Sequence, residues 1–235
     1  EFSKTEHLTS EGYFTYLKEF KGGHSLNAVA GYSYFEKNGE NFNAENYDFG
    51  VEGLKYWDLG AGSYLTDGKA AMGSGKNITE RLFALYARAN YSYNDKYMVS
   101  ATIRHEGSSK FAAENRWGNF WALSGGWRVS AEEFMKEFDW VSDLKVRFGY
   151  GVTGNNDFDA SYMANTLSRD QYWMLPSGSW AYVYGPSSNV NPYLGWEEKK
   201  EWNIGVDYSF FGNRMYGKFD YYRRKIDGMI YEVNV

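Results

Sequence analysis

The chain has 235 residues, and one fifth of them are aromatic, with 22 Tyr, 16 Phe and 9 Trp. So many aromatic side chains exclude a disordered chain, and the absence of cysteine excludes disulfides, zinc–thiolate sites and thiol catalysis. The net charge of -5, from 25 basic and 30 acidic residues, argues against a surface that binds nucleic acid. A mean hydropathy of -0.63 excludes a membrane-spanning helix. It does not exclude membrane-spanning strands, which need only about 9–11 residues with every second one apolar.

Apolar and polar residues alternate with a period of two along much of the chain, which is the pattern of β-strands with two different faces. In the first predicted strand the apolar face is ambiguous, because Phe14 and Tyr16 compete with Tyr13 and Leu17 for it. In chain order, the pattern predicts strands at residues 13–20, 26–34, 83–93, 97–103, 121–129, 144–152, 202–210 and 215–221. We therefore expect an all-β, antiparallel fold with about eight strands.

The connections between the predicted strands alternate between compact and long. Compact ones fall at residues 21–24, 94–96, 130–143 and 211–213, and long ones at residues 37–80, 107–117 and 153–200. In an up-and-down meander this order places every compact connection at one end of the sheet and every long one at the other. Outer-membrane β-barrels are organised in this way, with short turns on one side and long loops on the other.

One compact connection carries the only helix that we expect. Ser130 and Glu133 have the spacing of a capping box, and Phe134, Phe138 and Val141 follow at helical spacing. The sequence predicts a short amphipathic helix here, and we assign it no function.

Alternation alone does not say whether the apolar face meets lipid or a protein core. Aromatic residues near the strand ends favour lipid, because membrane barrels carry aromatic girdles at both interfaces, although β-propensity alone would also place them in strands. The aromatic residues in question are Tyr93, Tyr97, Tyr150, Tyr208, Phe210 and Tyr221.

Motifs for catalysis or cofactor binding are missing or incomplete. Residues 73–76 (GSGK) resemble part of a phosphate loop, but the flanking residues do not fit it, so we interpret them as a flexible loop. Asn155, Asp157 and Asp159 have the spacing of a calcium loop, but the required Gly and bidentate Glu are absent. The three histidines, His7, His24 and His105, lack the spacing of metal ligands. We expect no enzyme, no cofactor and no metal site.

Six sequence blocks point to a family. They closely resemble the barrel of SusC/RagA-type TonB-dependent transporters of Bacteroidetes, strongly over residues 81–235 and by pattern only over residues 1–80. The blocks are residues 104–111 (RHEGSSKF), 115–120 (NRWGNF), 126–130 (GWRVS), 140–147 (WVSDLKVR), 150–156 (YGVTGNN) and 191–197 (NPYLGWE).

The resemblance implies a 22-stranded transmembrane β-barrel in the outer membrane of a Gram-negative bacterium, exposed to lipid and lipopolysaccharide. It also implies a plug, a TonB box that engages TonB, and a SusD-like lipoprotein lid over the barrel. Residues 1–235 show neither a plug nor a TonB box, so we expect a barrel segment, with TonB contacted through parts outside it. The implied function is active import of a bulky nutrient oligomer, a glycan or a peptide. In that setting, cations on the polar strand faces would line the lumen or contact the plug; they are Arg88, Arg104, Arg128, Lys145 and Arg147.

The longest connection is rich in aromatic residues. Three interpretations remain open for them: contact with the nutrient, contact with the lipoprotein lid, or packing within the loop itself. Trp196, which lies in a family block, fits the packing role best. The candidates for ligand or lid contact are Tyr172, Trp173, Trp180, Tyr182 and Tyr184.

Two other functions also fit the strand pattern. Eight antiparallel strands can close a small OmpA-like outer-membrane barrel with a structural or adhesive role. A soluble carbohydrate-binding β-domain would bury the apolar face and expose the polar one.

Overall fold

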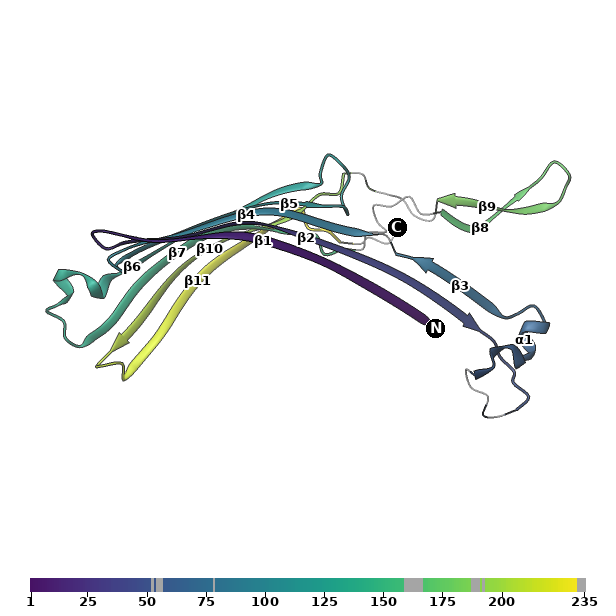
Figure 1. The fold of residues 1–235 in the computed structure, drawn as a ribbon, viewed down its shortest axis with the longest axis horizontal. Helices are drawn as coiled ribbons and strands as arrows, with labels where there is room; N and C mark the ends of the chain where they lie inside the picture. Colours follow the sequence, from purple (N-terminus) through teal and green to yellow (C-terminus); the bar gives the residue numbers. More distant parts are fainter. Residues whose placement is uncertain are drawn as a thin grey trace.

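A computed structural model describes residues 1–51, 53, 57–77, 79–158, 167–186, 191 and 193–231, with the side chains of residues 167–171, 185 and 186 left aside. The fold consists mainly of antiparallel strands, as predicted (Figure 1). The strands are β1 (Phe2–Phe20), β2 (His24–Glu45), β3 (Ala71–Lys76), β4 (Glu80–Tyr93), β5 (Tyr97–Ser108), β6 (Trp117–Arg128), β7 (Val141–Asn155), β8 (Leu167–Met174), β9 (Trp180–Pro186), β10 (Glu197–Phe210) and β11 (Met215–Asp227). The helical turns are η2 (Leu59–Ala61), α1 (Ser63–Thr66), η3 (Val129–Ala131) and η4 (Glu133–Met135). None of the helical segments in the described ranges is long and apolar enough to cross a membrane.

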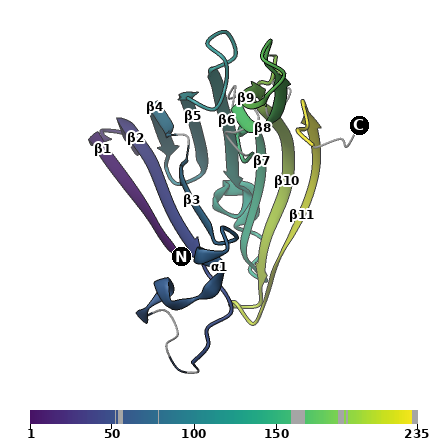
Figure 2. The ribbon, with the colours of Figure 1, turned by 90° about the vertical axis from the view of Figure 1, so that its right-hand side faces the viewer.

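Eight strands form one continuous sheet in the order β1-β2-β4-β5-β6-β7-β10-β11, and they correspond to the eight predicted strands. Figure 2 shows this sheet curved into an open arc, with β1 and β11 at its two edges. β3 extends the sheet by pairing with the second half of β2, and β8 and β9 form a separate hairpin. Among the described residues β1 and β11 do not pair, so these eight strands do not close on one another.

The compact and long connections lie at opposite ends of the sheet, as their alternation predicted (Figure 1). We call these the tight-turn end and the long-loop end. The β4–β5 turn shows why it can be tight: Asn94 and Asp95 both have positive φ, at 50° and 53°, which short polar residues tolerate best. The hairpin of β8 and β9 lies beyond the long-loop end.

The register of the sheet separates an apolar face from a polar face, because directly opposed residues in antiparallel strands point to the same side. The pairing of β1 with β2 shows which face of β1 is apolar. Phe14 lies opposite Ala30, which lies opposite Ala87. Phe14 and Tyr16 therefore lie on the apolar face, and Tyr13 and Leu17 on the polar one. Phe14 is 87% exposed, so no part of the described chain covers this face there.

Two aromatic bands edge the apolar face. All six aromatic residues named from the sequence lie on this face, and Trp121 packs with Tyr150 while Trp202 packs with Tyr221, at ring-centroid distances of 5.3 and 5.4 Å. On β10, Trp202 and Phe210 are eight residues apart, or about 27 Å along an extended strand. A strand tilted by about 35–45° would reduce this to roughly 20 Å, which approaches the apolar height of a membrane barrel.

The buried core is small and lies at the long-loop end. Phe111 and Phe120 are 2% and 6% exposed, and the hydroxyl-bearing Ser108 beside them is 1% exposed. A sheet that buries so little of its apolar surface within the described chain needs an apolar environment or further protein around it.

Several predicted boundaries were too short, and two local predictions were wrong. β1 begins at Phe2, well before residue 13, and β2 runs on to Glu45, into the predicted loop at residues 37–80. Residues 73–76 are not a flexible loop, because they belong to β3, where Gly75 lies opposite Asn41.

The expected helix at residues 130–141 is also wrong. Only two short 3-10 turns form, η3 and η4, separated by Glu132 in an extended conformation. Ser130 does not cap a helix, because its hydroxyl donates to the Asp143 carboxylate at 2.7 Å. The Glu132 carboxylate accepts hydrogen bonds from Tyr97, Trp127 and Lys96, and its backbone is extended between the two turns.

Candidate functional site

The five predicted cations all lie on the polar face. Lys145 is opposite Arg128, Arg147 is opposite Gly126, and the register carries the same side across β5 to Arg104 and β4 to Arg88. The register thus places all five cations on one face of the sheet, as the alternating pattern predicted.

Arg147 joins three strands. Its Nε and one terminal nitrogen donate to the two oxygens of Asp207, each at 2.8 Å, and the same terminal nitrogen donates to Asp220 at 3.0 Å. Gly205 lies between these groups, because a Cβ there would come within 2.7 Å of the Arg147 guanidinium and 2.5 Å of the Asp220 carboxylate. The bidentate geometry is the one in which arginine binds carboxylates most strongly.

The other four cations differ in their hydrogen-bond and ion-pair partners. Arg104 donates twice to Glu106, at 2.8 Å each, and Arg88 donates to Thr102 at 3.1 Å. Arg128 lies 3.3 Å from the Asp143 carboxylate without a hydrogen bond from its Nε. Lys145 forms no ion pair among the described residues and lines the hollow described next.

A shallow hollow of about 420 Å³ lies beside Lys145 and Arg147. Short hydroxyl and amide side chains supply donors and acceptors here, which suits contact with a polar chain or another protein segment. The polar residues of the hollow are Ser25, Asn27, Asn90, Ser92, Ser100, Ser124 and Asn203.

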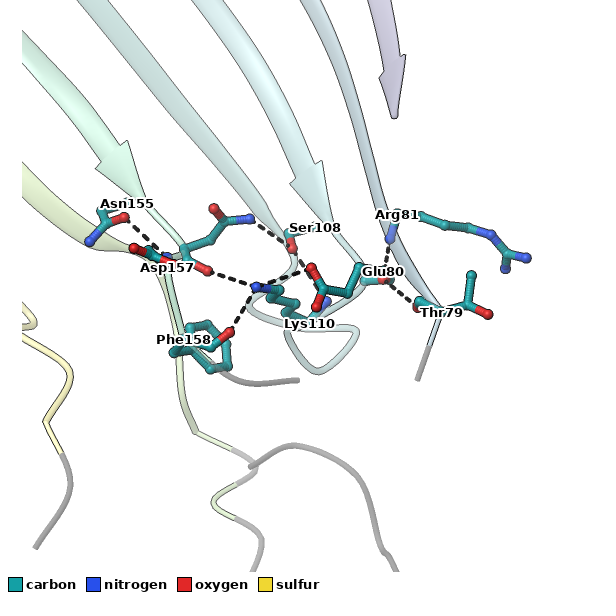
Figure 3. Close-up of polar contacts among 10 residues, drawn as sticks. Thr79, Glu80, Arg81, Ser108, Lys110, Asn155, Asp157 and Phe158 are labelled. Atoms are coloured by element: carbon teal, nitrogen blue, oxygen red, sulfur yellow. Dashed lines mark hydrogen bonds and ion pairs between the residues drawn. The ribbon is translucent and has the colours of Figure 1, made fainter. Parts of the chain in front are cut away.

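A second polar site lies at the long-loop end, around Lys110 (Figure 3). The Lys110 ammonium donates to the carbonyl oxygens of Phe158 at 2.7 Å and Asn156 at 3.4 Å, and it lies 3.3 Å from the Glu80 carboxylate. The Asn156 amide donates to the buried Ser108 hydroxyl at 3.1 Å. These contacts connect the start of β4, the β5–β6 loop and the segment after β7.

Aromatic residues pack against this polar site. Phe111 contacts Phe158 and Trp196 at ring-centroid distances of 5.2 and 5.0 Å, and Phe120 contacts Trp196 at 5.1 Å. Gly154 is necessary for this packing, because a Cβ there would lie 2.0 Å from the Phe120 ring. Trp196 therefore has the packing role predicted for it. We call Ser108, Lys110, Phe111, Phe120 and Trp196 the long-loop core.

The β8–β9 hairpin presents the five aromatic candidates from the long connection. Tyr172 and Tyr182 are opposed, with their hydroxyls 2.7 Å apart, and each is more than half exposed. Trp173 is 66% exposed, and Trp180 and Tyr184 are each 67% exposed. The hairpin pairs with no strand of the main sheet in the described ranges, and all five aromatic side chains are more than half exposed.

Of the three residues with calcium-loop spacing, Asn155 and Asp157 lie in the described part of the chain. The side-chain oxygen of Asn155 accepts a hydrogen bond from the backbone N–H of Asp157 at 3.0 Å, which closes a local turn. Asp159 lies outside the described residues. No group of three potential metal ligands occurs among the residues that were described.

The histidines instead contact neighbouring side chains. His24 shares a hydrogen bond with Tyr91 at 2.6 Å, and His105 stacks on Trp117 at 4.7 Å. His7 lies 5.6 Å from the Phe35 ring.

Comparison with known proteins decides the family. The family model described as "TonB dependent receptor-like, beta-barrel" matches residues 3–235. The chain belongs to this family. The SusC/RagA-type resemblance is thereby confirmed, as is the antiparallel barrel fold class.

Two relatives among TonB-dependent receptors illustrate the match. The receptor SusC of Bacteroides thetaiotaomicron is 35% identical over 156 residues, covering 66% of this chain and 16% of its own length. The receptor P39 of Formosa agariphila is 33% identical over 236 residues, covering 96% of this chain and 21% of its own length. The chain therefore spans about a fifth of the length of the curated relatives that it matches. These relatives are named as receptors, not enzymes.

Two solved structures share the fold of this chain. The RagAB peptide transporter structure has a TM-score of 0.82 at 22% identity, covering 99% of this chain and 25% of the matched chain. The siderophore receptor PirA from Pseudomonas aeruginosa has a TM-score of 0.55 at 14% identity. At these identities the likeness concerns the fold.

Sequence reasoning missed Lys110, Glu80 and Ser108 as members of a site. The available signal was indirect: the blocks at residues 104–111, 150–156 and 191–197, which carry the family resemblance, meet at this one place.

Proposed function

We propose that the chain forms part of the wall of an outer-membrane transporter that imports a bulky nutrient, a glycan or a peptide, by TonB-dependent active transport. Lipid and lipopolysaccharide would surround the apolar face, and the polar face would line the lumen or contact a plug. TonB would act through parts of the protein outside residues 1–235. No covalent chemistry is required of this chain.

The observation that carries the proposal is the separation of the two faces across all eight strands. The apolar face is bounded by two aromatic bands and remains uncovered, which fits lipid better than water. The other face carries the five cations beside a hollow lined with hydroxyl and amide groups. Because β1 and β11 do not pair, the described strands give no support to a closed, eight-stranded OmpA-like barrel.

For the hairpin we propose contact with a SusD-like lipoprotein lid. Exposed Trp and Tyr side chains are the residues that most often dominate protein–protein binding. The position of the hairpin beyond the long-loop end supports this role, because that end would face the outside of the cell (Figure 1). Direct contact of the same aromatics with the nutrient is the competing outcome.

Uptake of a labelled glycan or peptide by cells that express the full-length protein tests the proposed function. We expect uptake to require this gene and TonB, and to stop when an uncoupler collapses the proton-motive force. Uptake that persists without TonB or a proton-motive force would contradict active import.

A further inference from the structure

Lys110 is a largely buried cation that makes two hydrogen bonds and one ion pair. Its side chain is 13% exposed. An ammonium has three N–H donors, and three oxygens surround this one, from Phe158, Asn156 and Glu80, at 2.7 to 3.4 Å. Burying a cation is costly unless it is paired and hydrogen-bonded, so this set of acceptors is what makes the position tolerable.

The acceptors place the side chain at a junction of distant segments. Lys110 lies in the β5–β6 loop, while Phe158 follows β7 and is 48 positions away. Glu80 opens β4 on the other side (Figure 3). A second contact also joins the β5–β6 loop to the start of β4: the Ser109 backbone N–H donates to the Arg81 carbonyl at 2.8 Å.

Both ends of the segment that contains the hairpin are held at this junction. The chain enters residues 159–190 just after Phe158, which Lys110 binds through its carbonyl oxygen. It returns at Trp196, whose ring packs on Phe111 and whose Nε1 donates to the Arg116 carbonyl at 3.0 Å. Phe111 contacts the rings of both Phe158 and Trp196, so one residue of the β5–β6 loop joins the two ends.

The oxygens around Lys110 are of the kind that bind metal cations in other loops. The Asn155 side chain and the carbonyls of Asn156 and Phe158 form a compact turn, and carbonyl and carboxylate oxygens are ligands typical of calcium. Here a lysine of the chain itself supplies the positive charge. This contact therefore needs no bound metal ion.

We propose that Lys110 is a positioning residue for import: it holds the chain at Asn156 and Phe158, where the segment with the aromatic hairpin begins. This contact lies beside the Phe111–Trp196 contact at which the segment returns, and so sets the place from which the hairpin meets its partner. The link to import rests on the proposed function, whereas the tether itself does not. Loss of the charge frees two carbonyl oxygens and a carboxylate, so the hairpin then samples a wider range of positions.

Spin labels on the full-length protein test the tether directly. The sites are Ser177, in the turn between β8 and β9, and Lys225 on β11, both exposed. The variants are Lys110→Met, Lys110→Arg and, as a matched control, Lys136→Met, which removes an exposed lysine that pairs with Glu133 at the opposite end. We expect the distance distribution to widen about twofold in Lys110→Met, to narrow again in Lys110→Arg, and to stay unchanged in Lys136→Met.

Glu80→Gln gives a second test if Lys110→Met does not fold. It keeps a side-chain acceptor and removes only the charge, so we expect a smaller widening in the same direction. An unchanged distribution in the folded variants would overturn the inference, whatever the transport assay gives.

Transport kinetics provide the functional readout. We expect the half-saturating nutrient concentration to rise about tenfold in Lys110→Met, with partial rescue by Lys110→Arg and an unchanged amount of folded protein. Widening without any change in uptake would overturn the role in import. Wild-type cells that show no TonB-dependent uptake would contradict the proposed function alone, because the label distances do not depend on transport.

Discussion

Trp196 donates a hydrogen bond from its Nε1 to the carbonyl oxygen of Arg116, 3.0 Å away, although the two residues are 80 positions apart in the chain. Arg116 is the residue before β6, and Trp196 the residue before β10. The bond therefore ties together two strands that are not neighbours in the sheet, with β7 between them.

Phe111→Ala tests the long-loop core. Because Phe111 is 2% exposed and packs against two other rings, we expect its loss to lower the free energy of unfolding by about 3–5 kcal/mol. Trp196→Phe keeps an aromatic ring and removes one hydrogen bond, so the expected cost is about 0.5–1.5 kcal/mol. Denaturant unfolding in lipid gives both values. Tyr193→Ala is the control: Tyr193 is near Trp196 in the sequence but is 83% exposed, so its loss should change the free energy of unfolding little.

Arg147→Met tests the ion pairs on the polar face. Asp207 and Asp220 would lose their shared cation, but all three side chains are about a third exposed, so water screens much of the effect. A double-mutant cycle with Asp207→Asn should give a coupling energy of about 1 kcal/mol that shrinks at high salt. A coupling of zero at low salt would mean that the observed geometry contributes nothing to stability.

Glu132 predicts a pH dependence at the tight-turn end. Hydrogen bonds from the Tyr97 hydroxyl, and then from Trp127 and Lys96, lower the pKa of this carboxyl below its ordinary value of 4.5. Its stabilising contribution is therefore complete above about pH 4.5, where the unfolded carboxyl is ionised, and is lost as the pH falls through the lower folded pKa. Glu132→Gln should remove this part of the acid sensitivity. Equal slopes of stability against pH for the two proteins would refute the assignment.

The hairpin aromatics should contribute to binding of the lipoprotein. We expect Trp173→Ala and Trp180→Ala each to weaken the complex by about 1–2 kcal/mol, close to a tenfold change in Kd. Phe134→Ala, another exposed aromatic but at the tight-turn end, is the matched control and should leave Kd unchanged. If lid binding is unchanged but the affinity for nutrient falls, the aromatics contact the nutrient. If both are unchanged, neither role holds.

The sequence predicted most of the sheet because one alternating pattern repeats in eight segments. It underestimated β1 and β2 because their outer halves carry polar residues on the otherwise apolar face as well, as at Glu36, Asn38 and Glu40, so no alternation marks them. The tight turns were predictable from Gly22 and Asn94, since few other residues adopt positive φ.

The remaining features depend on distant contacts. The spacing of Ser130 and Glu133 predicted a helix, but Asp143 binds the serine, and the distant Lys96 and Tyr97 together with the nearby Trp127 bind Glu132. Nothing in the local sequence distinguishes Lys110 from other loop lysines, because its partner Phe158 lies in the segment after β7. A linear pattern could group the polar-face cations because a strand fixes their side, whereas no local rule brings residues 110 and 158 together.

The central claim is that the apolar face of the sheet meets lipid and the polar face does not. Ala101 and Ser100 are adjacent on β5 and lie on opposite faces, so they form a matched pair. In the full-length protein refolded into lipid bilayers, Ala101→Arg should lower the free energy of unfolding by about 2–4 kcal/mol, and Ser100→Arg by less than about 1 kcal/mol. An equal cost for the two variants, or a larger one for Ser100→Arg, would contradict the account.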